Sequence, residues 1–199
     1  MRNDQEGMST VTVTPLGISV LALLAERPMH PYEMYRLLLE RHEDRRVKVR
    51  PGSLYHTVDR MAEIGLVEAT GTERDGGRPE RTTYRITDAG REALAERIRT
   101  LLATPVNEYP QFPVALGEAH NLPRHEVIEL LRARTRRIEG ELAEGAALLR
   151  AAADRHVEEA YLLAAHYLQE QLTAELSWLT DLIGRLERKE LRWPNEDGL

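Results

Sequence analysis

Cysteine is absent from this chain of 199 residues, and its absence removes several kinds of chemistry at once. Without a thiol the chain forms no disulfide and offers neither a thiolate metal ligand nor a cysteine nucleophile. A cysteine-free chain fits a reducing compartment, so we expect a cytoplasmic protein. The longest apolar run, residues 16–25, is too short to cross a membrane, and no signal-peptide pattern opens the sequence. We therefore expect no membrane partner.

Positive charge is not in excess, since the net charge is −6. Residues 1–100 carry 16 basic and 16 acidic side chains, whereas residues 101–199 carry 11 basic and 17 acidic ones. The acidic surplus therefore lies entirely in the second half. Because nucleic-acid binding depends on local patches and not on the sum, the first half must be judged by where its arginines fall.

Apolar periodicity and turn signals in residues 14–104 predict three helices, a β-hairpin and a fourth helix. Thr14 followed by proline predicts a capped helix start, and Gly65 predicts the end of the third helix. An Asp-Gly-Gly turn joins two extended runs, the second of which alternates with the period of a strand. The expected helices cover residues 16–27, 31–41, 51–65 and 88–102, and the expected strands cover residues 66–72 and 81–87, with a brief extra strand over residues 47–49. This order is that of a winged helix-turn-helix domain.

Residues 105–199 predict a different organisation, in which a proline-rich linker precedes long amphipathic helices. Residues 1–13 form a flexible arm, residues 105–122 the linker with a short helix at 112–119, and residues 123–199 a helical dimerisation domain. Two long antiparallel helices break near Arg155, and a second chain would cover their apolar surface. The expected dimerisation residues repeat every three or four positions: Leu168, Leu172, Leu176, Leu179, Ile183 and Leu186. The fold class is thus mainly α with a small β-hairpin wing.

The third predicted helix has two faces at about 100° per residue. Leu54, Val58 and Met61 fall on the side that belongs to the core. The other side offers hydrogen-bonding and basic groups, as expected of a recognition helix in the major groove. Arginines on the wing suit a minor groove or the flanking phosphates. The candidate DNA-binding residues are Ser53, Tyr55, His56, Arg60, Arg74, Arg78 and Arg81.

Several short blocks of the first hundred residues occur together in a specific order. These blocks are Leu16-Gly17-Ile18-Ser19-Val20-Leu21-Ala22-Leu23-Leu24, Pro28-Met29-His30-Pro31-Tyr32-Glu33-Met34, Pro51-Gly52-Ser53-Leu54-Tyr55, Gly65-Leu66-Val67, Gly77-Arg78-Pro79 and Tyr84-Arg85-Ile86-Thr87. Over roughly residues 14–100 the sequence closely resembles the PadR family of transcriptional regulators. Its remainder resembles the larger branch of that family, which has a helical C-terminal domain.

The resemblance implies a homodimer that binds a palindromic operator in double-stranded DNA, most often as a repressor. In some members a small molecule such as a phenolic acid or a hydrophobic drug releases the DNA. The serine and tyrosine of the family's recognition helix match Ser53 and Tyr55, and its Gly-Arg-Pro wing matches residues 77–79. Two departures are Pro31, where a glycine is common, and the few basic residues of the third helix.

Aromatic side chains in the second half are candidates for a small aromatic effector site. Tyrosine and tryptophan near a dimer seam can line such a site, although core packing is their more frequent role. The candidate effector-binding residues are Tyr109, Phe112, Tyr167 and Trp178.

Two other classes of function remain open alternatives. His120 with His125, and His166 with Glu170, have spacings found in metal sites, but no third ligand lies nearby in sequence. No phosphate loop, dinucleotide fingerprint or nucleophile elbow is present. We therefore expect no catalytic residue, no metal and no cofactor, and not an enzyme. The acidic second half leaves open a protein-interaction adaptor that has lost DNA binding.

Overall fold

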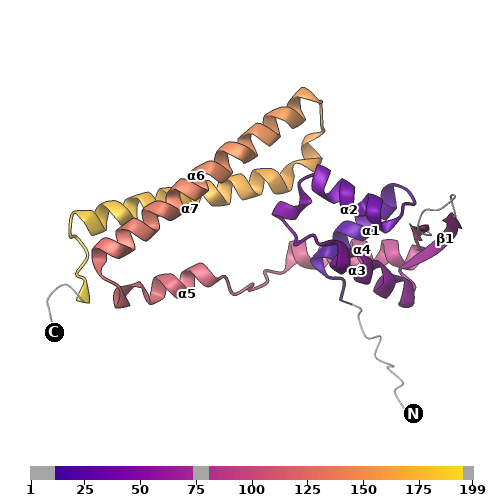
Figure 1. Ribbon diagram of the computed structural model, residues 1–199, viewed down its shortest axis with the longest axis horizontal. Coiled ribbons are helices and arrows are strands. Elements are labelled where there is room, and N and C mark those ends of the chain that lie inside the picture. Colours follow the sequence, from indigo (N-terminus) through magenta and orange to yellow (C-terminus); the bar gives the residue numbers. More distant parts are fainter. Residues whose placement is uncertain (1–11, 74–80, 195–199) are drawn as a thin grey trace, which may run out of the picture. The chain divides into compact units, whose positions relative to one another are not determined.

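The computed structural model describes residues 12–73 and 81–194 of the chain. The chain divides into two compact units, Met1–Asn107 and Glu108–Leu199, and the division falls inside the proline-rich residues 105–122 (Figure 1). The described part is mainly helical with one two-stranded antiparallel hairpin, which confirms the predicted fold class.

The N-terminal unit contains the predicted order of helices and strands. Its elements are α1 (Pro15–Glu26), α2 (Pro31–Glu40), the 3-10 turn η1 (Glu43–Arg45), α3 (Pro51–Glu63), β1 (Val67–Glu73), β2 (Arg81–Ile86) and α4 (Asp88–Ala103). Helix α1 is apolar on most of its surface, and it packs against α2, α3, α4 and β2. Because it supplies the centre of the core, α1 fixes the positions of the other elements.

Local sequence signals set the ends of these helices. The Oγ1 atom of Thr14 accepts a hydrogen bond from the Gly17 amide at 3.2 Å, and Thr87 caps α4 by accepting from the Gly90 amide at 3.0 Å. Such caps satisfy amides that have no acceptor within the helix. Helix α3 ends at Gly65, whose φ of +75° lies in the left-handed region that favours glycine.

The hairpin is joined to the helical part of the unit by backbone hydrogen bonds. Val67 lies opposite Ile86, Glu73 lies opposite Arg81, and a bulge interrupts the pairing between Ala69 and Gly71. On the other edge of β2, Tyr84 and Met29 exchange two backbone hydrogen bonds of 3.1 Å each. The base of the wing is therefore held by the segment that connects α1 and α2.

The brief strand predicted over residues 47–49 is wrong, because Val47 lies in a bend and the described part of the chain has no strand at residues 48 and 49. The alternation that suggested the strand is nevertheless real. Val47 and Val49 pack against the core of the unit, and Lys48 between them is exposed.

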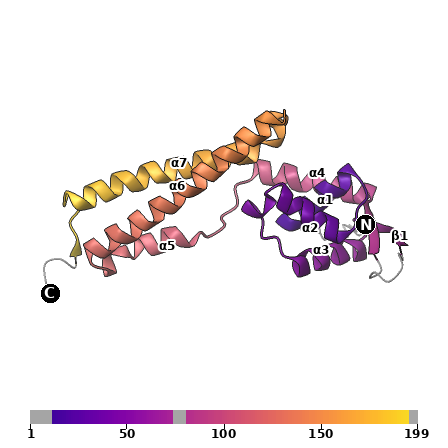
Figure 2. The same cartoon turned by 45° about the horizontal axis from the view of Figure 1, so that its top comes forward.

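The C-terminal unit is built on a pair of long helices. Its elements are α5 (Gln111–Gly117), the 3-10 turn η2 (Ala119–Asn121), α6 (Arg124–Asp154), the 3-10 turn η3 (Glu159–Tyr161) and α7 (Leu163–Glu187). Helices α6 and α7 run antiparallel and side by side in both views (Figures 1 and 2). The predicted break at Arg155 is confirmed, and Tyr161 lies in η3 before the second long helix begins.

The segment after α7 packs back onto the start of α6. The Nη2 atom of Arg124 donates to the carbonyl oxygen of Leu191 at 3.1 Å. The indole N–H of Trp193 donates to the carbonyl oxygen of Leu122 at 2.8 Å. Leu191 and Trp193 also contact the apolar core between α6 and α7. This end of the helix pair is therefore closed by its own chain.

Candidate nucleic-acid interface

Helix α3 separates into the two faces that its sequence predicts. Leu54 and Val58 are fully buried, and Met61 is 5% exposed. The predicted DNA-binding residues of this helix, Ser53, Tyr55, His56 and Arg60, are all exposed. The side chain of Tyr55 is 45% exposed to solvent. The exposed side of the helix therefore carries hydrogen-bonding groups, one aromatic ring and one arginine, together with the acidic side chains of Asp59 and Glu63.

The start of α3 carries free amide groups. Pro51 occupies the first helical position, where its missing N–H costs nothing, and Arg50 precedes it without a side-chain cap. The amide of Leu54 is the first to bond within the helix, to the carbonyl oxygen of Arg50 at 3.0 Å. The amides of Gly52 and Ser53 therefore point beyond the helix, and such amides together with the helix dipole favour an anion.

Only part of the DNA-binding site predicted on the wing lies within the described residues. Arg81 opens β2 opposite Glu73 in the backbone register. Arg74 and Arg78 lie outside the described residues. The adjacent cross-strand pair Glu68 and Arg85 is joined by an ion pair of 2.6 Å, so the charge of Arg85 is neutralised within the hairpin.

Hydrogen bonds and charge connect the wing to α3. The hydroxyl of Thr87 donates to the carbonyl oxygens of Gly65 at 2.8 Å and Leu66 at 3.1 Å, so the end of β2 is tied to the turn after α3. Burial of the Tyr84 ring, together with the negative charge of Asp59, raises the pKa of the Tyr84 hydroxyl. Asp59 of α3 thus lies on the side of the helix that faces the base of the wing.

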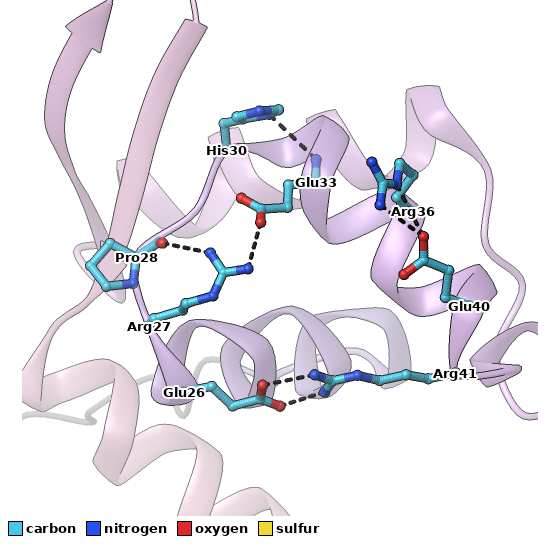
Figure 3. A network of polar contacts seen from close by, with 8 residues as sticks. All are labelled: Glu26, Arg27, Pro28, His30, Glu33, Arg36, Glu40 and Arg41. Carbon is cyan, nitrogen blue, oxygen red and sulfur yellow. Dashed lines mark hydrogen bonds and ion pairs between the residues drawn. The ribbon is translucent and has the colours of Figure 1, made fainter.

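Acidic residues neutralise several arginines around α1 and α2 (Figure 3). Arg41 forms a bidentate pair with Glu26 at 2.5 and 2.9 Å, and Arg27 binds Glu33 at 2.5 Å. The hydrogen bonds from these guanidinium groups lower the pKa of both carboxyl groups. These pairs join α1 to α2 and to the segment that connects them. Because the two arginines are already paired, they are less able to bind an anion.

Most of the predicted dimerisation residues pack against α6 of the same chain. Leu179 is fully buried, and Leu186 and Ile183 are 1% and 9% exposed, because all three pack against α6 of the same chain. Leu172 and Leu176 line the edge of the same core. At about 100° per residue Leu168 lies on this side as well. The apolar face of α7 that predicted a subunit interface is thus covered by α6 of the same chain.

A second apolar stripe on α7 stays open to solvent in the single chain. Leu163 and Tyr167 are each 63% exposed, and Trp178 is 49% exposed. At about 100° per residue these three side chains lie within roughly 60° of one another, on the side opposite Leu179 and Ile183. Large apolar side chains gathered in this way are typical of an interaction surface.

The four candidate effector-binding residues do not gather in one described cavity. Tyr109 is 80% exposed, whereas the ring of Phe112 is covered by the guanidinium of Arg134, whose Cζ lies 3.7 Å from the ring centroid. Tyr167 and Trp178 lie on the exposed stripe. A surface hollow of about 300 Å³ is found elsewhere, on α2, lined by His30, Tyr32, Glu33, Arg36 and Leu37.

The histidines form no metal centre in the part of the chain that the structure describes, where no three potential ligand side chains come together. The Nδ1 atom of His120 lies 3.2 Å from the carbonyl oxygen of Gly117, and His125, His166 and Glu170 are exposed. None of the described helices combines the length and apolar character needed to cross a bilayer.

Residues 20–96 match the model of the transcriptional regulator PadR-like family. Over these residues, which make up less than half of its length, the chain is similar to that family. The matched segment runs from α1 to α4 and therefore includes α3 and both strands of the wing. No curated protein matches the sequence.

Solved structures of PadR regulators share the fold of this PadR-like chain. Bacillus subtilis PadR in complex with operator DNA is 16% identical, with a TM-score of 0.72 over 85% of this chain and 97% of that one. The same regulator in complex with p-coumaric acid is 14% identical, with a TM-score of 0.66 over 88% of this chain and 99% of that one. The PadR-like regulator BC1756 from Bacillus cereus is 16% identical, with a TM-score of 0.63 over 86% of this chain and 98% of that one.

Sequence reasoning on this PadR-like chain missed two features of the interface. The pairing of Met29 with Tyr84 anchors the wing, and its only sequence signal is the extended backbone expected beside Pro28 and Pro31. The pairing of arginines with acidic residues decides which positive charges remain free. Residues distant in sequence make some of these pairs, so a count of charges could not reveal them.

Proposed function

We propose that this PadR-like regulator binds a palindromic DNA operator as a homodimer and represses transcription. The observation that carries the proposal is the exposed face of α3, with Ser53, Tyr55, His56 and Arg60 opposite a fully buried anchoring face. In a winged helix-turn-helix domain the N-terminal part of such a helix enters the major groove. The wing arginines Arg74, Arg78 and Arg81 reach the flanking phosphates or the adjacent minor groove.

The exposed stripe of Leu163, Tyr167 and Trp178 supports a second copy of the chain as the partner. A homodimer has twofold symmetry, so its operator is an inverted repeat. If the dimer binds one face of the duplex, its two α3 helices are separated by one helical turn, roughly 34 Å. Residues 14–104 then bind DNA, residues 105–122 connect, and residues 123–199 dimerise.

A small aromatic effector belongs to the proposal because a relative of the same fold binds p-coumaric acid. Tyr109, Phe112, Tyr167 and Trp178 are its candidate contacts. Titration of the protein with phenolic acids, followed by tryptophan fluorescence and melting temperature, tests this part. A bound effector raises the melting temperature as its concentration exceeds its dissociation constant. Unchanged fluorescence and melting with the whole set would remove the effector from the proposal.

The test of DNA binding is a mobility shift with the DNA directly upstream of this protein's own gene. Excess unrelated competitor and a salt series accompany it. We expect a saturable shift that survives competitor and weakens as salt rises, because phosphate contacts release counterions. Absence of binding to any duplex at low salt would refute the proposal and favour a protein-interaction adaptor instead.

A further inference from the structure

The segment that leads into α3 has a regular alternation of buried and exposed side chains. Val47 and Val49 are half-buried against the apolar core of the N-terminal unit, whereas Lys48 and Arg50 are exposed. The alternation in burial places the valines and the two cations on opposite sides of the segment. The two valines therefore hold the segment against the core and turn both cations outward, immediately before the first turn of α3.

Six of the described cations in the N-terminal unit are already neutralised by acidic side chains. Figure 3 shows three of these pairs around α1 and α2. The pairs in this unit are Arg27 with Glu33, Arg36 with Glu40, Arg41 with Glu26, Arg46 with Glu43, Arg85 with Glu68 and Arg99 with Glu96. A paired guanidinium has little left to offer a phosphate.

Among the described residues of this unit, four cations make neither an ion pair nor a side-chain hydrogen bond. They are Lys48, Arg50, Arg60 and Arg91. Lys48 and Arg50 lie within the three residues before α3, whereas Arg60 lies in the last turn of α3 and Arg91 lies on α4. The equal numbers of acidic and basic residues in the first hundred positions thus hide a local surplus of positive charge at the start of α3.

The backbone at this place carries positive character as well. Arg50 is the residue that precedes the helix, and the amides of Gly52 and Ser53 extend beyond it. The acidic Asp59 is nine residues further along, which corresponds to about 13 Å of helix axis. Asp44, the nearest acidic residue before Lys48 in the chain, is exposed and makes no ion pair with it among the described residues. Two free cations and a helix start therefore occupy one small surface.

We propose that Lys48 and Arg50 bind phosphates of duplex DNA beside the start of α3 and so fix the position of this helix in the major groove. This inference rests on the proposed function, because it concerns the same DNA. Contacts to phosphates set the register and orientation of a protein on the duplex without reading its sequence. These two residues therefore supply affinity and placement, and the side chains of α3 supply specificity.

The test compares the salt dependence of DNA binding for the full-length protein and two double variants. The variant K48Q/R50Q removes the two free cations, and R36Q/R46Q removes two cations that are paired with acidic residues. Both variants lose two positive charges, and they differ in whether those charges are free or paired with acidic residues in the wild type. The probes are the upstream DNA fragment and a short mixed-sequence duplex, titrated between about 50 and about 200 mM salt.

We expect K48Q/R50Q to reduce the slope of log affinity against log salt by about 0.9 for each lost contact. Between the two salt concentrations the affinity of K48Q/R50Q should therefore fall by a factor that is about ten times smaller, per bound chain, than the factor by which the wild-type affinity falls. R36Q/R46Q should keep the wild-type slope, and circular dichroism should show both variants folded. Equal slopes for K48Q/R50Q and the wild type, or an equal reduction by both variants, would overturn this inference while leaving the proposed function intact. A wild-type protein that binds neither duplex would overturn both.

Discussion

Gly90 lies so close to Leu66 that a Cβ atom at position 90 would stand 2.1 Å from the carbonyl oxygen of Leu66. That carbonyl oxygen also accepts hydrogen bonds from the amide and the hydroxyl of Thr87. The first turn of α4 is thereby held against the end of the turn that follows α3. The orientation of the wing relative to α3 depends on this close approach.

The substitution Gly90→Ala should destabilise the N-terminal unit, because the neighbouring atom is backbone and cannot turn away. We expect a loss of about 1–3 kcal/mol, as is typical when an extra carbon is forced into a packed site. Urea unfolding followed by circular dichroism measures it. Gly52→Ala is the matched control, since nothing lies within 4 Å of its Cβ position, and its stability should be unchanged or slightly higher. Equal stability of both variants would contradict the close approach.

The substitution Tyr55→Ala should weaken operator binding because it removes the exposed ring of the recognition helix. We expect a loss of about 1–3 kcal/mol, or roughly fivefold to 150-fold in affinity, with the dimer intact. Mobility shift measures the affinity and sedimentation the oligomer. Arg78→Ala, in the segment outside the described residues, should act in the same direction. The control Tyr161→Ala removes a tyrosine that is 77% exposed and should leave the affinity unchanged. Wild-type affinity in both test variants would remove these residues from the interface.

The substitution Trp178→Glu should shift the protein from dimer to monomer, since it places a charge on the exposed stripe of α7. A central aromatic residue of an interface typically contributes about 2 kcal/mol or more, so the dimer dissociation constant should rise at least thirtyfold. Sedimentation equilibrium measures this constant. Thr173→Glu, which adds the same charge away from the stripe, is the control. A dimer of unchanged affinity would show that the stripe is not the subunit interface.

The stability of the N-terminal unit should fall in acid through the pair of Glu26 and Arg41. The hydrogen bond from Arg41 lowers the pKa of Glu26 in the folded protein below its ordinary value of 4.5. A lowered pKa means that the stabilisation is present above pH 4.5 and is lost as the pH falls through the folded value. Both side chains are nearly half exposed, so we expect about 1 kcal/mol or less.

Urea unfolding at pH 7 and at about pH 3.5 tests this pair, with Glu26→Gln and Arg41→Gln as the variants. Each variant should reduce the difference in stability between the two pH values. The double variant should reduce it no further, because either change already removes the interaction. An undiminished pH dependence in Glu26→Gln would assign the effect to other carboxyl groups.

Local sequence determined much of the N-terminal unit. Thr14 and Thr87 cap α1 and α4 through their own side chains, and Gly65 ends α3 because it takes up a left-handed conformation. The two faces of α3 follow from its period, which places Leu54 and Val58 on one side and Tyr55 on the other. Each of these features depends on residues that lie within about one helical turn of one another, so it can be predicted from the local sequence.

Pairing between distant segments was decided only by the tertiary structure. The alternation of residues 47–49 predicted a strand, but a strand exists only with a partner, and the free edge of β2 is taken by Met29. Equal charge in the first hundred residues did not reveal which arginines are neutralised, because Arg41 finds its partner Glu26 fifteen residues away.

The same distinction holds for the C-terminal unit. The heptad-like spacing of Leu179, Ile183 and Leu186 determined that one face of α7 is buried, and the sequence alone carried that information. Whether α6 or a second chain covers this face could not be read from the spacing, since an apolar stripe packs equally well against either. The tertiary structure assigned it to α6, because the turn at Arg155 folds α7 back along the helix that precedes it.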